Sequence, residues 1–130
     1  MTMSRTEENA PLVVQLQQQT SASTVIAVAG EVDSSNSQQM QQHIAELAAG
    51  NTAALIALDL SELTFLGCAG IRALVECHDV ATQQGHRFEI SRAHENVRQV
   101  LAICDLTDLF HLAVPEGPGE DHRRFWRPWW

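Results

Sequence analysis

The sequence contains no lysine: its eight basic residues are all arginine, they face 16 acidic residues, and the formal net charge is −8. Three of the arginines lie within the last ten residues, so residues 1–120 hold only five basic groups against fifteen acidic ones. A surface this acidic is unsuited to nucleic acid, because phosphate binding requires positive charge. The composition excludes a nucleic-acid-binding module and favours a basic or mixed protein partner.

Long apolar runs are also missing. The longest falls well short of the ~20 residues that a membrane-spanning helix needs, and the polar start of the chain does not resemble a secretion segment. A length of 130 residues with 45% apolar content suits one globular domain. We therefore expect a cytoplasmic protein with no membrane contact, in which residues 11–114 form a single domain between tails at 1–10 and 115–130.

Paired cysteine motifs are absent as well. None of the three cysteines belongs to a Cys-x-x-Cys pair or stands near histidine at metal-ligand spacing. This pattern excludes a disulfide framework and makes structural zinc improbable. We expect no cofactor, and we expect Cys77 and Cys104 to be small buried side chains.

Hydrophobic periodicity predicts an α/β fold. Apolar and β-branched runs predict strands at 12–16, 24–29, 53–60, 87–91 and 109–114, of which the first two form a hairpin. Apolar residues at helical spacing predict helices from about residues 36 to 49, 68 to 84 and 95 to 105. Asp33, Ser34 or Ser35 is expected to cap the first helix, and Gly50-Asn51 to close it. The order predicts one domain, a mixed β-sheet with alternating helices.

One junction stands out as a candidate site. The strand ending at Leu60 is expected to pass through a short turn of small residues into the helix whose first turn begins at Cys68. Such a turn exposes free backbone N–H groups and the positive end of a helix dipole, where a side chain or an anion can be recognised.

Two short runs carry a family resemblance. Residues 65–71, Phe-Leu-Gly-Cys-Ala-Gly-Ile, resemble the signature of the sulfate transporter and anti-sigma factor antagonist (STAS) domain, in which two apolar residues precede Asp-Ser-Ser-Gly. Residues 30–33, Gly-Glu-Val-Asp, resemble the Gly-Glu-x-Asp of the same family. The resemblance covers about residues 11–114. It departs from the family pattern where Gly67 and Cys68 replace the Asp and the phosphate-accepting Ser.

The resemblance implies a STAS-like fold and an anti-sigma factor antagonist. Such a protein binds a cognate anti-sigma factor, which in the phosphate-switched systems is also a kinase, and thereby releases a sigma factor. It needs no catalytic site. The residues implied to contact the partner are Glu31, Asp33, Gly67, Cys68, Ala69, Gly70 and Arg72.

Two interpretations of Cys68 remain open. In one, Cys68 is a small residue of the turn, and the protein binds constitutively or is phosphorylated elsewhere, with Ser34, Ser35, Ser61 and Thr64 as the alternatives. In the other, the helix N-terminus lowers the pKa of the thiol and makes it redox-sensitive. The hypothesis is then a disulfide switch between Cys68 and Cys104, which requires Cα atoms within about 7 Å.

The C-terminal run from Arg123 to Trp130 is basic and holds all three tryptophans. We expect it to dock on its own domain, on a second copy to form a homodimer, or on a partner. Two other functions remain as alternatives: a scaffold subunit of a STAS-domain stress-signalling assembly, and a thiol-dependent enzyme using Cys68. A phosphatase-like Cys-x5-Arg loop is absent, because Arg72 comes too early. The lysine-free, alanine-rich composition suggests a GC-rich bacterial genome.

Overall fold

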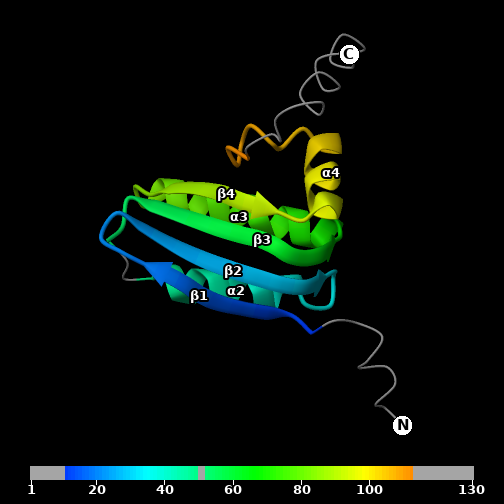
Figure 1. The fold of residues 1–130 in the computed structure, drawn as a ribbon, viewed down its shortest axis with the longest axis horizontal. Helices are drawn as coiled ribbons and strands as arrows, with labels where there is room; N and C mark the ends of the chain where they lie inside the picture. The colour runs from blue at the N-terminus through cyan, green and yellow to red at the C-terminus, as the bar shows by residue number, and fades with distance from the viewer. Residues whose placement is uncertain (1–10, 50–51, 113–130) are drawn as a thin grey trace.

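A computed structural model describes residues 11–49 and 52–112, which form a mixed α/β domain (Figure 1). The predicted alternation of strands and helices is confirmed from the first strand to the last helix. In chain order the elements are β1 (Val13–Gln19), β2 (Ser23–Val32), α2 (Ser37–Ala48), β3 (Leu55–Leu66), α3 (Cys68–Gln83), β4 (Arg87–Ala93) and α4 (Glu95–Ile103). None of these helices is long and apolar enough to cross a membrane.

The strands form one sheet in the order β1-β2-β3-β4. The β1–β2 pair is antiparallel, which confirms the predicted hairpin, and β3 and β4 continue in parallel to β2. Parallel neighbours require crossover connections, which α2 and α3 provide. Figure 1 shows both helices behind the sheet, whereas its front carries no helix and α4 stands at one end. We call the front the open face and the side behind α2 and α3 the covered face.

Strand β2 separates the two faces of the sheet most clearly. Its side chains alternate between half-buried and buried along all ten residues, and the buried set includes Ile26, Val28 and Val32. They belong to the main apolar core with Met40 and Ile44 of α2. The regular period of two is the pattern expected of a strand covered on one side.

Strand β3 is longer than its sequence pattern predicts. The expected turn after Leu60 is wrong, because pairing with β2 continues to Leu66 and only Gly67 separates the strand from α3. The buried residues Leu60, Leu63 and Leu66 are three positions apart instead of two. The β2–β3 register shifts twice, and each irregularity inserts a residue that reverses which side chains face the core. The broken alternation therefore marks two bulges in one strand.

The predicted final strand is also wrong within the described residues. Residues 107–111 form turns, and His111 has a φ of 53°. The N–H of Phe110 donates to the carbonyl of Leu106, and the Phe110 carbonyl accepts one bond from Ile90 N–H on the edge of β4, at 2.9 Å. The Phe110 side chain is fully buried. The apolar run correctly predicted burial, but local turn bonds satisfy much of its backbone; residues 113–114 lie outside the described residues.

Candidate functional site

The two sequence motifs meet at the carboxyl ends of β2 and β3. Val32 and Leu66, the last residues of these strands, are register partners. One residue further along, Gly67 N–H donates to the Val32 carbonyl at 2.9 Å. The loop that contains Asp33 therefore lies beside the turn that leads into Cys68. The structure brings together the residues that the sequence analysis placed in one site.

The loop between β2 and α2 is held by two polar side chains. The Asp33 carboxylate accepts hydrogen bonds from the Ser35 hydroxyl at 2.6 Å and the Ser35 N–H at 2.9 Å. These bonds, with the hydroxyl contributing most, hold the pKa of Asp33 below its ordinary value of 3.8. Asn36 accepts from Asp33 N–H and donates to the Glu31 carbonyl, both at 2.9 Å. Asp33 is thus an exposed carboxylate in an organised loop.

The prediction of the α2 N-cap was wrong. The cap residue is Asn36, whose side chain makes no capping bond to the helix, because its amide is engaged with Asp33 and Glu31. Sequence reasoning missed this organising role. The run Asp-Ser-Ser-Asn did contain the signal, since Asp and Asn side chains commonly bond the backbone of turns.

Gly67 caps α3 with extended backbone and no side chain, so the first N–H groups of the helix receive no side-chain acceptor. Cys68, at the first helical position, is exposed, and Ala69 is half-buried. The helix start predicted at Cys68 is confirmed. The turn offers backbone donors and an exposed thiol at the molecular surface.

Gly70 lies inside the structure. It is buried, and a Cβ atom added to it would lie 2.5 Å from Leu66 Cδ1 and 2.8 Å from Val32 Cγ1. Glycine therefore allows α3 to approach the ends of both strands. Gly70 was predicted to contact the partner, but it lies inside the domain and positions the turn. The other predicted contact residues are exposed or half-buried.

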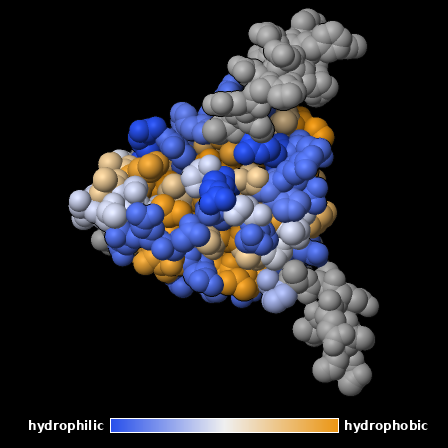
Figure 2. Space-filling model, viewed as in Figure 1, coloured by the Kyte–Doolittle hydropathy of each residue, from blue (hydrophilic) through white to orange (hydrophobic). Residues whose placement is uncertain are grey.

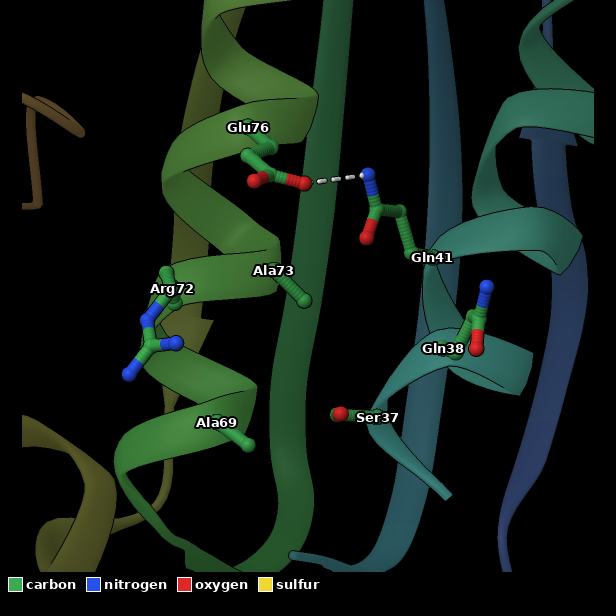
Figure 3. Close-up of a pocket in the computed structure, with 7 residues that line it drawn as sticks. All are labelled: Ser37, Gln38, Gln41, Ala69, Arg72, Ala73 and Glu76. Atoms are coloured by element: carbon green, nitrogen blue, oxygen red, sulfur yellow. Dashed lines mark hydrogen bonds between the residues drawn. The ribbon is translucent and has the colours of Figure 1, made fainter. Parts of the chain in front are cut away.

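A pocket of about 260 Å³ lies between α2 and α3 beside this turn. Its lining comprises Ser37, Gln38, Gln41, Ala69, Arg72, Ala73 and Glu76. Figure 3 shows Gln41 and Glu76 meeting across the gap, with Gln41 Nε2 donating to Glu76 Oε1 at 2.9 Å, while Arg72 points away from α2. Only Ala69 and Arg72 of this lining were predicted as site residues. The α2 residues were missed because sequence spacing does not show which helix packs beside α3.

Comparison with known proteins agrees with this architecture. A family model described as the STAS domain matches residues 13–116. The chain belongs to the STAS domain family. The resemblance drawn from residues 30–33 and 65–71 is thereby confirmed.

Three solved structures share the fold of this STAS domain. An anti-sigma factor antagonist from Mycobacterium paratuberculosis is 20% identical with a TM-score of 0.68, covering 78% of this chain and 85% of its own. The anti-sigma factor antagonist SpoIIAA in its unphosphorylated form is 18% identical with a TM-score of 0.64, covering 87% and 96%. The phosphorylated Bacillus cell fate determinant SpoIIAA gives 18% identity, a TM-score of 0.59, and coverages of 87% and 99%.

The three cysteines of this STAS domain differ in environment. Cys77 is buried, as predicted, and burial raises the pKa of its thiol to about 11. Cys104 is exposed, so the prediction of burial was wrong. The helix ends at Ile103, one residue too early to carry Cys104 onto the buried stripe of Val97 and Leu101.

Cys68 and Cys104 are both free thiols in the structure. Helix α4 contacts β3 at its first turn, where Asn96 Nδ2 donates to the Thr64 carbonyl at 3.1 Å. Cys104 lies at the opposite end, eight residues on, which corresponds to about 12 Å along a helix axis. The predicted pairing of the two thiols stays a prediction.

Proposed function

We propose that this STAS domain is an anti-sigma factor antagonist that binds a cognate anti-sigma factor and so releases a sigma factor for transcription. The contact residues proposed are Glu31 and Asp33 on one side, with Gly67, Cys68, Ala69 and Arg72 on the other. The observation that carries the proposal is the junction of the β2–α2 loop and the β3–α3 turn at one end of the sheet. The fold that it shares with two solved anti-sigma factor antagonists supports the same function.

The proposed activity is binding without chemistry. Within residues 11–49 and 52–112 the Cys68 thiol makes no hydrogen bond to a base, and no group of three or more His, Cys, Asp or Glu side chains could hold a metal ion. A nucleophilic thiol needs such a base or another activating group within reach. We therefore prefer a protein-binding role, in the cytoplasm and without a cofactor, to a thiol-dependent enzyme.

Control by phosphate at position 68 does not fit this chain. A thiol is no ordinary substitute for the hydroxyl that the family phosphorylates, so we propose that binding is constitutive or controlled at another residue. Ser34 and Ser35 are exposed in the β2–α2 loop, where added phosphate charge would lie beside Asp33. Like-charge repulsion there would disturb the loop.

Oxidation offers a second form of control. In the predicted switch, hydrogen peroxide takes two electrons and two protons from Cys68 and Cys104, a disulfide forms, and the peroxide leaves as two waters. Mass spectrometry under non-reducing conditions after mild peroxide treatment measures this directly. Two free thiols with unchanged partner affinity would dismiss the redox switch and leave the binding function intact.

Binding is tested with the anti-sigma factors of the source organism, each purified and titrated with the full chain in a calorimeter. We expect one of them to bind in a 1:1 complex and to give up its sigma factor in a transcription assay. Asp33→Ala should weaken binding at least tenfold. Asp79→Ala is the matched control, because Asp79 is also an exposed carboxylate but lies eleven residues along α3 from Cys68. A wild-type chain that binds none of the anti-sigma factors would refute the proposal.

Measurements of assembly size address the remaining alternatives. A scaffold subunit would form a large assembly, which light scattering after size exclusion distinguishes from a small binder. A homodimer through the C-terminal tail is measured by the same method, with a chain truncated at Pro118 as comparison. The tail itself lies outside the described residues, so its docking stays a prediction.

A further inference from the structure

An exposed aromatic side chain lies on the open face at the same end of the sheet. Phe65 is 50% exposed, whereas the other large side chains at this end of β3, Leu63 and Leu66, are buried. The open face is seen in Figure 2, where apolar and polar side chains mix over the strands. Half of this phenylalanine is thus open to solvent beside a predicted contact site.

The two bulges of β3 place Phe65 there. Phe65 pairs in register with Glu31, and Leu66 pairs with the buried Val32. Because neighbouring residues of a strand point to opposite faces, Phe65 shares the open face with Glu31. If β3 alternated regularly, burial of Leu60 and Leu66 would require residues 62 and 64 to be buried as well. Leu63 would then face outward.

Two carboxylates flank Phe65 on this face. Glu31 is its direct partner on β2, and parallel strands lie about 4.8 Å apart. Glu62 pairs with Ala29, two residues before Glu31 on β2 and therefore on the same face. Glu62 is exposed and Glu31 is half-buried. We call Glu31, Glu62 and Phe65 the acid–aromatic surface.

Of the arginines that the structure describes, one offsets a buried carboxylate and one lies on the covered face. Arg92 pairs in register with Asp59, a buried carboxylate whose charge it offsets. Arg72 belongs to α3, on the covered face. Glu95, at the start of α4, adds a further acidic group at this end, since the neighbouring Asn96 bonds to the Thr64 carbonyl. The carboxylates of Glu31, Glu62 and Glu95 therefore lie at the same end of the sheet as the aromatic ring.

We infer that the acid–aromatic surface docks an arginine-bearing segment of the partner protein. A guanidinium group stacks on an aromatic face and directs its N–H donors outward in its own plane, parallel to the ring, where two carboxylates can accept them. Lysine supplies the charge but neither the planar stacking nor the fork of donors. A second copy that presents the same face fits poorly, because the same carboxylates would face each other. The chain's own run from Arg123 to Trp130 also carries arginine, so the titration described below is repeated with a chain truncated at Pro118. Peptide binding that appears only after truncation would identify that run as the occupant and overturn the inference.

This inference rests on the proposed function for the identity of the partner, but the chemistry follows from the surface alone. It adds Phe65 and Glu62 to the proposed contact residues and extends the site from the α3 turn onto the open face. An experiment with a defined probe can therefore test it without an anti-sigma factor.

The probe is a short capped peptide with two arginines, titrated into the isotopically labelled full chain and followed by amide chemical shifts. Matched peptides carry lysine or uncharged citrulline in place of arginine. We expect saturable shifts at residues 31, 62 and 65 with the arginine peptide, at least tenfold weaker binding of the lysine peptide, and no saturable binding of the citrulline peptide. Equal binding of the arginine and lysine peptides, or shifts confined to other parts of the chain, would overturn the inference.

Variants sharpen the test. Phe65→Ala and Phe65→Leu should both abolish the shifts, since leucine keeps apolar bulk but has no aromatic face. Val80→Ala is the control, because Val80 is 48% exposed on α3 and lies away from β3. Unchanged peptide binding by Phe65→Leu would contradict the stacking argument. Self-association of the wild type that Phe65→Ala removes, without peptide binding, would identify a second copy as the occupant and overturn the inference too.

The anti-sigma factor then separates the two proposals. Phe65→Leu and Glu62→Gln should each weaken its binding about tenfold, equivalent to 1.4 kcal/mol, and Val80→Ala should not. Equal binding by all variants refutes the acid–aromatic surface and leaves the proposed function standing. No binding by the wild type refutes the proposed function. The peptide titration still tests whether the acid–aromatic surface binds arginine.

Discussion

Replacing Gly70 with alanine should destabilise the domain, although alanine is the better helix former. In a helix interior the exchange favours alanine by about 1 kcal/mol. Here the new Cβ would lie 2.5 Å from Leu66 Cδ1 and 2.8 Å from Val32 Cγ1, well inside the ~3.5–4.0 Å optimum between carbon atoms. Leu66 is 3% exposed and Val32 is fully buried, so neither can swing into solvent.

The steric overlap of the new Cβ decides whether Gly70→Ala raises or lowers the free energy of unfolding. Overpacking of a buried site costs about 1–3 kcal/mol, and the gain in helix propensity recovers only part of that amount. We expect a net loss of about 1 kcal/mol in the free energy of unfolding, which lowers Tm by roughly 4–8 °C in a domain of this size. Urea denaturation followed by circular dichroism measures the free energy, and a thermal scan measures Tm.

A double-mutant cycle identifies the cause. Leu66→Val removes a methylene next to the added Cβ, so the cost of Gly70→Ala should be smaller in the Leu66→Val background than in the wild type. Gly67→Ala is the matched glycine control, because its Cβ would meet nothing closer than 3.4 Å. Strictly additive effects, or a Gly70→Ala variant as stable as the wild type, would refute the close-approach argument.

Three further predictions concern the site. Gly67→Asp should stabilise the domain by about 0.5–1 kcal/mol in urea, because its carboxylate can accept the free N–H groups of α3; a loss of stability would contradict this. Alkylation of the native chain should label Cys68 and Cys104 rapidly and Cys77 only after unfolding, because burial and a pKa of about 11 disfavour its thiolate; equal labelling rates by mass spectrometry would speak against the packing of α3. Asp33 has a pKa below 3.8 when folded, so its contribution is complete above that value and is lost as the pH falls through the lower folded pKa. The wild type should therefore lose more stability than D33N between about pH 4 and 2, and parallel pH profiles would exclude the effect.

Periodicity predicted the elements whose environment is uniform along their length. Strand β2 buries every second residue, and α3 begins at the residue where apolar helical spacing begins. In each case the element keeps one apolar pattern along its length and packs against the core on one side, so sequence spacing is sufficient to predict it.

The failures came where the local pattern changes partway. The bulges in β3 broke the alternation and resembled the end of a strand, yet pairing with β2 carried the strand on to Leu66. The last apolar run forms turns, in which backbone N–H groups bond to nearby carbonyls such as that of Leu106 instead of to a neighbouring strand. Cys104 became exposed because α4 stops at Ile103. None of these outcomes depends on side-chain spacing alone.

The amino-acid order by itself determined that this is an acidic α/β domain of the STAS family, with its candidate site at the junctions after β2 and β3. Motifs and periodicity are properties of residues close in sequence, so they can be recognised without the structure. Only the tertiary structure decided that Phe65 faces outward between carboxylates and that Gly70 is a packing residue. Those facts depend on strand register and helix approach, which join residues about 30 positions apart and have no local signature.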